Sequence, residues 1–331
     1  MTALLEVEGL RVDLSLPAGV LHAVQDVSFH VEKGETFSLV GESGCGKTMT
    51  ALAVMGLLPR SATRSAERIL FEGEDITHAH ERRMTAIRGA RMTMIFQEPM
   101  TSLDPCYTIG DQLEEVLLEH RRVSRREARE RAVFLLEKVG ITAAASRLKQ
   151  YPHQLSGGLR QRVMIAMSLM CGPSLIIADE PTTALDVTIQ AQILSLLVSV
   201  QKEYETGMIL ITHDLGVVAR TADRLAVMYC GQVVETGTVA EVFTRPLHPY
   251  TRGLMRCIPI PGKTRPGQKL DTIPGIVPTP IGDLRGCLFR NRCPHARPAC
   301  AGEGIEEVRL TPGRSYRCIL QPEENPEKAA A

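Results

Sequence analysis

Two patterns of apolar positions follow each other along the chain. Apolar and polar residues alternate through residues 4–14 and again through residues 27–31, and a period of two predicts half-buried antiparallel strands. Later, short and mostly apolar runs predict strands that are buried on both faces. Several of these runs lead directly into polar turns with Gly or Asp, where an open α/β sheet places its ligands. The runs are Phe37–Val40, Met92–Phe96, Leu175–Ala178 and Met208–Thr212.

The middle of the chain changes to a helical period. Between about residues 104 and 171 the apolar positions follow a helical spacing, for example over Arg129–Val139 and Leu159–Met170, which predicts a helical subdomain. Residues Asp223–Gly237 predict instead a hairpin that turns at Cys230-Gly231.

Proline is concentrated at the C-terminal end. Thirteen of the twenty prolines fall in residues 246–331, and proline interrupts helices because it lacks a backbone N–H. A disordered tail is one interpretation of such a segment. Because it also holds four cysteines and several apolar residues, we expect a loop-rich appendage that is held together by its own cross-link.

Composition and charge narrow the class of protein. The 331 residues suffice for one large or two modest domains, and 38 basic residues balance 38 acidic ones, which gives no bulk attraction to nucleic acid. An arginine-rich stretch at 121–129 is mixed with Glu127 and Glu130, which favours a solvated helix face over an RNA contact.

Targeting features point to the cytosol. The first residues lack the basic region of a secretory signal. No run reaches the about 18 apolar residues that span a bilayer. We therefore expect a protein of a reducing compartment, which would reach a membrane only through protein partners.

A phosphate-binding loop follows the first buried strand. Residues 41–48 read GESGCGKT and precede a helical run at Thr50–Leu58, which matches G-x-x-x-x-G-K-[ST] in its strand–loop–helix setting. Glycines let backbone N–H groups face an anion, and the helix adds its positive end. Lys47 is expected at the β- and γ-phosphates and Thr48 at Mg²⁺. The nucleotide-contacting residues expected here are Gly41, Ser43, Gly44, Cys45, Gly46, Lys47, Thr48 and Met49.

Two later strand ends supply the remaining chemistry. The apolar run at 175–178 delivers Asp179 and Glu180, the first suited to Mg²⁺ and the second to polarising a water molecule. His213 follows the strand at 208–212. Alone it would be an ordinary turn residue, but beside a phosphate loop we expect it to contact the γ-phosphate.

A second helix start is suited to phosphate. Ser156, Gly157 and Gly158 open the helical run that ends near Met170, and Ser is a good N-cap while the two glycines leave the helix N-terminus bare for an anion. Because the chain already has one phosphate loop, this start suggests contact with a nucleotide held by another subunit.

These motifs together resemble the ATP-binding subunit of an ABC transporter. Residues 41–48 resemble Walker A, Gln97 the Q-loop, 155–162 the signature, 175–180 Walker B, Ala184-Leu185-Asp186 the D-loop and His213 the switch histidine. The resemblance implies a P-loop NTPase (RecA-like) α/β core with an antiparallel β subdomain and a helical subdomain, in a cassette at 1–245. It also implies ATP and Mg²⁺ as cofactors, with Thr48, Gln97 and Asp179 near the metal and Lys47, Glu180 and His213 catalytic.

The C-terminal part narrows the resemblance to importers of dipeptides, oligopeptides or nickel. Residues 245–254 contain the segment His-Pro-Tyr-Thr, which is similar to that subfamily, as are residues 96–105 and 151–156. This implies a peripheral ATPase on the cytoplasmic face of the membrane that powers peptide uptake. Its partners would be a second cassette, a paralogue rather than an identical chain, two permease subunits and an extracytoplasmic peptide-binding protein, with no nucleic acid.

Other functions compete with peptide import. A soluble ABC ATPase would usually carry tandem cassettes or a long coiled-coil insertion, and neither is present. A protein that only holds nucleotide would not need Lys47, Glu180 and His213. An importer of nickel or another solute shares the same motifs.

Four of the nine cysteines lie in the last 45 residues, at Cys287, Cys293, Cys300 and Cys318. A cytosolic location disfavours disulfides, and zinc sites favour closer pairs. Gaps of five, six and seventeen residues suit a bulkier iron–sulfur cluster, and some members of the resembled subfamily hold a [4Fe–4S] cluster in a similar pattern. Arg285, Arg290, Arg292 and Arg297 are expected to offset its negative charge. Four free thiols are the alternative.

Overall fold

The protein divides into two compact units in the computed structural model. The structure describes residues 3–98, 102–183, 185–258, 271–282, 284–302 and 304–322. Unit 1 consists of Met1–Leu5, Val31–Thr36 and Leu70–Ile211, and unit 2 of Glu6–His30, Phe37–Ile69 and Thr212–Ala331.

Parallel strands form the centre of unit 1. The strands β7 (Met92–Ile95), β8 (Leu175–Asp179) and β9 (Gly207–Thr212) pair in parallel in that order, with Met92 opposite Leu175 and Leu175 opposite Gly207. Every residue of β8 and β9 is buried, which explains the near absence of polar residues in these runs. The predicted buried strands are therefore confirmed here.

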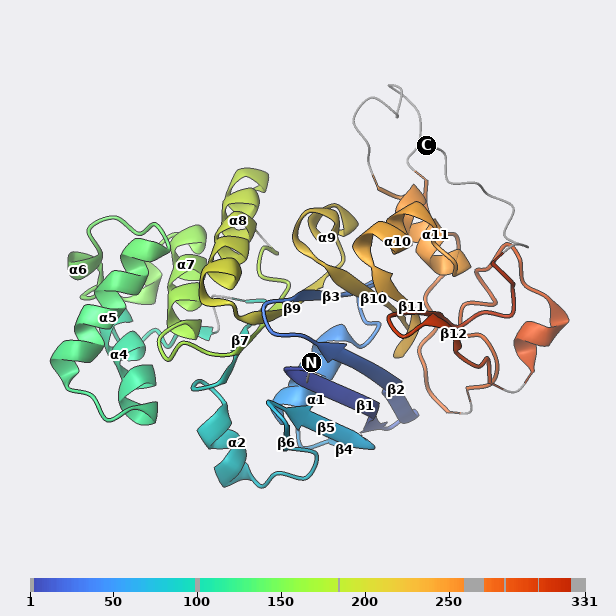
Figure 1. Ribbon diagram of the computed structural model, residues 1–331, viewed down its shortest axis with the longest axis horizontal. Coiled ribbons are helices and arrows are strands. Elements are labelled where there is room, and N and C mark those ends of the chain that lie inside the picture. Colours follow the sequence, from blue (N-terminus) through green and yellow to red (C-terminus); the bar gives the residue numbers. More distant parts are fainter. Residues whose placement is uncertain are drawn as a thin grey trace. The chain divides into compact units, whose positions relative to one another are not determined.

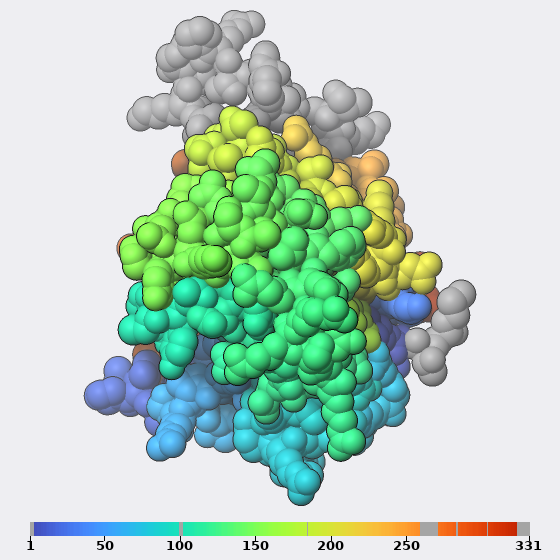
Figure 2. Space-filling model, turned by 90° about the vertical axis from the view of Figure 1, so that its left-hand side faces the viewer, coloured from blue at the N-terminus to red at the C-terminus, as the bar shows by residue number. Residues whose placement is uncertain are grey.

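Helices make up most of the rest of unit 1 (Figure 1). The helices α4, α5 and α7 pack on one another, and Figure 2 looks onto this green helical region. Capping boxes start α4 at Thr108 and α5 at Ser124. In each, the side chains of the N-cap residue and of the residue three positions later accept hydrogen bonds from each other's backbone N–H groups. The helices are α2 (Glu81–Ile87), α4 (Ile109–His120), α5 (Arg125–Lys138), α6 (Ala144–Arg147), α7 (Gly157–Ser168) and α8 (Val187–Tyr204), with the 3₁₀ turn η1 (Pro152–Gln154).

The arginine-rich stretch lies mostly on α5 and faces solvent. Arg126 pairs with Glu130 one turn later, and Arg129 pairs with Glu114 of α4. The first of these pairs lies on the solvated helix face that the sequence predicts.

Unit 2 contains antiparallel strands and the strand that precedes the phosphate loop. The strand β1 (Leu5–Leu16) lies between β2 (Gly19–Val31) and β4 (Ala62–Ser65). Separately, β3 (Thr36–Val40) pairs in parallel with β10 (Arg224–Tyr229), and β10 forms a hairpin with β11 (Gln232–Thr238). The predicted hairpin turn at Cys230-Gly231 is confirmed. In unit 1, the short strand β6 (Glu74–Asp75) pairs with Leu70 and Phe71 at the end of β5 (Arg68–Phe71).

The proline-rich C-terminal part packs into unit 2. After α9 (Leu215–Thr221) and α10 (Val239–Thr244), the helix α11 (Pro249–Arg256) starts with proline at its first position, where no N–H is needed. The strand β13 (Arg314–Tyr316) pairs with both β11 and β12 (Val308–Thr311). A 3₁₀ turn, η2, covers Pro298–Ala301.

A buried ion pair fastens this part to β11. The Glu235 side chain is fully buried and accepts hydrogen bonds from Arg314 at 2.6 Å and from the N–H groups of Leu247 and His248 at 2.8 and 2.9 Å. A carboxylate out of water needs such partners. The C-terminal residues described are thus integrated by specific contacts rather than trailing as a tail.

No helix in the described ranges has the length and apolar character that crossing a membrane requires.

Candidate functional site

The phosphate loop lies in unit 2 between β3 and α1 (Lys47–Met55). Two of its glycines have neighbours that exclude a side chain: a Cβ at Gly41 would lie 2.3 Å from the Met228 carbonyl oxygen, and one at Gly46 would lie 2.3 Å from that of Ala23. Gly46 also has a φ of 103° at the N-cap of α1, a conformation that favours glycine. The loop therefore needs glycine at these positions for steric reasons.

Lys47 is folded into this loop. Its side chain is buried, and Nζ donates to the carbonyl oxygens of Gly41 at 2.9 Å and Glu42 at 3.0 Å. An ammonium group held by two backbone oxygens keeps its charge in place within an anion-binding loop.

The other predicted loop residues differ in exposure. Ser43, Gly44 and Thr48 are exposed, while Gly46 and Met49 are half-buried. Cys45 is buried, and burial raises the pKa of its thiol. The exposed side of the loop therefore offers hydroxyl and backbone groups.

The carboxylate pair lies in unit 1 at the end of β8. Asp179 ends the strand and is 2% exposed. Glu180 follows with a φ of 43°, an uncommon conformation for a residue other than glycine. Its N–H donates to the Ile211 carbonyl oxygen at 3.0 Å, so β9 helps to hold it.

Two neighbours orient the Glu180 carboxylate. Its Oε2 accepts hydrogen bonds from Thr183 Oγ1 at 2.8 Å and from Gln97 Nε2 at 3.2 Å. The structure therefore brings the predicted Gln97 and Glu180 together. Thr183 was not predicted; its position three residues after the glutamate, in a turn, is the only sequence signal for it.

His213 lies directly after β9 and is exposed. The next residue, Asp214, accepts hydrogen bonds from the N–H groups of Gly216 and Val217 at 2.7 and 3.3 Å. This N-cap fixes the start of α9 immediately after the histidine.

The glycine-rich helix start is formed by α7 in unit 1. Ser156 occupies the N-cap position with an extended backbone, but its side chain makes no capping hydrogen bond. Ser156 and Gly157 are exposed, which leaves this N-terminus accessible. A Cβ at Gly158 would lie 3.0 Å from Ile189 Cγ2 of α8, so the second glycine permits close packing of two helices.

The predicted D-loop is described in part. Ala184 lies outside the described residues, as do residues 99–101 of the segment after Gln97. Asp186 Oδ1 accepts a hydrogen bond from the Ile189 N–H at 3.0 Å and caps α8.

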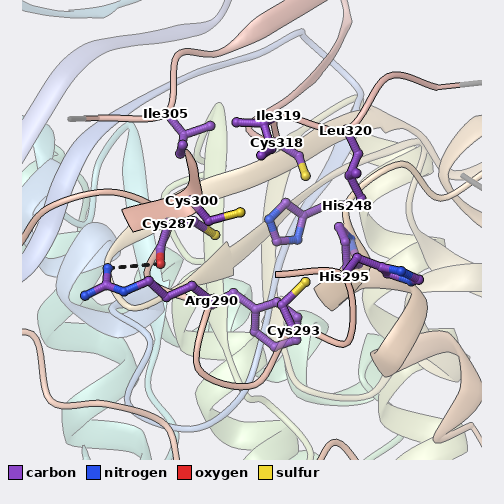
Figure 3. A pocket seen from close by; sticks show the side chains of 12 residues that line it. His248, Cys287, Arg290, Cys293, His295, Cys300, Ile305, Cys318, Ile319 and Leu320 are labelled. Carbon is purple, nitrogen blue, oxygen red and sulfur yellow. Dashed lines mark hydrogen bonds between the residues drawn. The ribbon is translucent and has the colours of Figure 1, made fainter. Parts of the chain in front are cut away.

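The four C-terminal cysteines line one cavity in unit 2, together with His248, Phe289 and Arg290 (Figure 3). All four cysteines are free thiols. Gly286, just before the first of these cysteines, has a φ of 68°. The Cys287 N–H donates to the Cys300 carbonyl oxygen at 2.8 Å, which joins the chain segments around these two cysteines.

Burial raises the pKa of three of these four thiols. It raises the pKa of Cys287 to about 11, and the charges of Cys318, Cys300 and Cys293 act in the same direction. The pKa values of Cys293 and Cys318 are also raised, first by burial and then by neighbouring cysteines. All four cysteines line the same cavity, so the thiolate of one would raise the pKa of its neighbours.

The cavity does not have the form of a single-ion site. Among the residues that the structure describes, no group of three or more His, Cys, Asp or Glu side chains is arranged to hold one metal ion. Arg292, which the sequence places among the arginines around the cysteines, binds Glu42 of the phosphate loop through its guanidinium group. Arg290 does line the cavity, and its Nη1 donates to the Cys287 carbonyl oxygen at 3.3 Å.

Comparisons with known families match both parts of the chain. Residues 24–183 match the family model "ABC transporter", and residues 234–300 match "Oligopeptide/dipeptide transporter, C-terminal region". The two matches cover the phosphate loop and three of the four cysteines.

Several curated proteins are similar over nearly their whole length. The oligopeptide transport ATP-binding protein AppD of Bacillus subtilis is 50% identical over 331 residues, which is 99% of this chain and 100% of that protein. The oligopeptide transport ATP-binding protein OppD of Salmonella typhimurium is 47% identical over 97% of this chain and 95% of its own length.

Solved structures agree on the fold. The dimeric ATP-binding cassette MJ0796, in a post-hydrolysis state bound to ADP and Pi, has a TM-score of 0.63 and 25% identity, covering 71% of this chain and 98% of its own. The expected P-loop NTPase class of the cassette is thereby confirmed. With these relatives and both family models in agreement, the chain belongs to the ATP-binding subunits of oligopeptide/dipeptide ABC transporters.

Proposed function

We propose that this chain hydrolyses ATP and couples ATP binding and hydrolysis to the uptake of dipeptides or oligopeptides. The observation that carries this proposal is the combination of an intact phosphate loop around the buried Lys47 with a C-terminal part that matches the peptide-transporter family. A cassette of another ABC transporter family would need the first feature but not the second.

The phosphate loop and the polar residues around β8 have separate roles in this proposal. The loop backbone and Lys47 bind the β- and γ-phosphates, and Thr48, Gln97 and Asp179 hold Mg²⁺ directly or through water. Glu180 accepts a proton from the attacking water, for which its carboxylate is oriented by Thr183 and Gln97.

Two further groups complete the reaction. His213, exposed directly after β9, contacts the γ-phosphate. Ser156, Gly157 and Gly158 at the exposed start of α7 contact the nucleotide of a second cassette, because a helix N-terminus attracts phosphate.

The proposed assembly follows from membership of the family. At the cytoplasmic face of the membrane, this chain and a second cassette (a paralogue) bind two permease subunits. A peptide-binding protein serves the same complex from the extracytoplasmic side. In the proposed division, residues 1–245 form the cassette, about 104–171 its helical subdomain, and 246–331 the importer-type extension. A soluble ABC ATPase without transport function, or an importer of nickel, is the competing proposal.

Purification from membranes separates these proposals. We expect a tagged chain to be recovered from membranes with two integral membrane proteins and to hydrolyse ATP only when Mg²⁺ is present, with EDTA abolishing the activity. Recovery from the soluble fraction with no integral membrane protein would favour the soluble ATPase. Uptake assays with nickel and with peptides then separate the two importers.

We propose further that the cysteine cavity holds a [4Fe–4S] cluster. In support, four thiols line one cavity, and none of the described residues that line it is acidic. A cluster spreads its ligands more widely than a single metal ion, for which the described ranges contain no group of three or more ligands. When bound, the cluster would supply one iron–thiolate bond to each of Cys287, Cys293, Cys300 and Cys318 and so cross-link the extension. The residues themselves are arranged for this by Gly286, whose Cβ would otherwise lie 2.2 Å from the Cys300 carbonyl oxygen.

A further inference from the structure

Glu42, the second residue of the phosphate loop, is held by residues far along the chain. Its N–H donates to Tyr250 Oη at 2.9 Å, and its carboxylate accepts two hydrogen bonds from Arg292, at 2.7 and 3.0 Å. Its carbonyl oxygen accepts the hydrogen bond from Lys47 Nζ. One residue of the loop therefore joins the phosphate-binding lysine to the C-terminal extension.

Arg292 is fixed in place by its surroundings. Its side chain is 4% exposed, Nε donates to the Pro274 carbonyl oxygen at 3.0 Å, and the guanidinium group lies over the rings of Tyr229 and Phe289. These two rings pack on each other and on Tyr250. A planar guanidinium group that makes two hydrogen bonds to one carboxylate and lies over two aromatic rings is a rigid contact.

The charge of Glu42 is unfavourable in a loop that binds phosphate. A carboxylate there repels an anionic ligand and competes for the ammonium group of Lys47. Arg292 compensates this charge, and the Coulombic attraction between the two side chains is stronger in these partly buried surroundings than in water. Without Arg292, a partly buried carboxylate would remain uncompensated beside the loop.

We propose that Arg292 is a positioning residue that sets the ATP affinity of the phosphate loop through Glu42. The extension, beyond any role in importer assembly, then acts directly on nucleotide binding. This inference rests on the proposed binding of ATP by the loop.

A double-mutant cycle in the full chain tests the inference, with the dissociation constant of Mg·ATP measured by equilibrium dialysis. We expect Arg292→Met to weaken binding by about tenfold, the effect of one uncompensated charge at short range. Glu42→Gln should bind nearly as well as the wild type because it removes the repelling charge. The double variant Arg292→Met with Glu42→Gln should regain that affinity, and in turnover Arg292→Met should raise KM for ATP while kcat is retained.

The matched control is Arg309→Met, which also removes an arginine paired with a glutamate of the extension, Glu307, but at an exposed site. It should leave ATP affinity unchanged. If Arg292→Met does not fold, Arg292→Lys keeps the charge and loses the two-point contact, and a smaller loss is expected.

Two results would overturn the inference: unchanged ATP affinity in Arg292→Met, or a loss that Glu42→Gln fails to rescue, which would mean that Arg292 acts only through packing. Failure of the wild-type chain to bind ATP would instead refute the proposed function.

Discussion

At the scale of single residues, Glu180 combines an uncommon backbone conformation with a doubly bonded carboxylate. A φ of 43° in a residue other than glycine costs free energy, and such a conformation persists where the surroundings determine it. Here the Ile211 carbonyl oxygen, Thr183 and Gln97 supply those contacts. The direction of the carboxylate is therefore set before a nucleotide arrives.

This geometry predicts the behaviour of Glu180→Gln. The amide keeps the shape and the hydrogen bond from Thr183, but it cannot take a proton from water. We expect ATP binding at the wild-type level and hydrolysis reduced by at least ~100-fold, with cassettes trapped as a closed pair. Turnover at the wild-type rate would show that another group is the base.

A contrasting result is expected for Lys47→Ala. The ammonium group is buried within the phosphate loop and donates to the Gly41 carbonyl oxygen. Its loss therefore removes the positive charge expected to bind the phosphates. ATP affinity itself should fall by at least ~10-fold, as measured by dialysis, while the unfolding midpoint changes little. Normal affinity combined with lost hydrolysis would assign Lys47 to catalysis rather than binding.

The identity of the motif residues could be predicted from sequence, whereas their supporting contacts could not. A loop such as 41–48 has a local signature because its conformation depends on its own glycines. Arg292 is 250 residues from Glu42, and nothing local marks the pair. From the sequence, Arg292 was therefore expected at the cysteines beside it in the chain. In the folded protein its guanidinium group binds Glu42 instead.

At the scale of elements, the buried strands were predictable and one long helix was not. The strands β8 and β9 have both faces buried, so apolar runs identify them. The helix α8 is rich in β-branched residues, which weaken a helical signal. Its buried positions Ile193, Leu197 and Val200 do follow a helical spacing, but only part of one face is apolar.

The start of α7 predicts a division of labour between two cassettes. Ser156→Arg places a long cation at an exposed helix N-terminus, where it opposes the helix dipole and blocks a phosphate. This chain's own ATP binding should remain within about twofold of the wild type, while hydrolysis at the partner cassette's loop fails in a nucleotide-trapping assay. Loss of ATP binding at this chain's own loop would contradict a shared site.

The cysteine-bearing segments give a test of the proposed cluster. Protein purified without oxygen should contain iron and acid-labile sulfide in near-equal amounts and absorb in the visible range. Cys→Ser changes at Cys287, Cys293, Cys300 or Cys318 should each remove the iron and the colour. The control Cys106→Ser changes an exposed cysteine outside the cavity and should keep both. Stoichiometric zinc without sulfide, or no metal at all, would refute the cluster.

At the scale of the whole molecule, the C-terminal extension is built into the unit that carries the phosphate loop. Three sets of contacts join residues after 245 to residues before it. They are the ion pair of Glu235 with Arg314, the pairing of β13 with β11, and the hydrogen bonds of Tyr250 and Arg292 with Glu42. The composition change near residue 245 shows that the segment is different in kind. The composition itself contains no information about these long-range pairings, because they depend on side chains that only folding brings together.

Transport by the reconstituted complex is the most direct test of the central claim. The complex, with this chain, its partner cassette and the permeases, is placed in proteoliposomes with the peptide-binding protein on the side opposite the cassettes, and uptake of a labelled peptide is measured with and without ATP. We predict uptake that requires ATP and Mg²⁺ and stops when this chain carries Glu180→Gln. Peptide uptake that continues undiminished without ATP, or with the Glu180→Gln chain, would contradict the account.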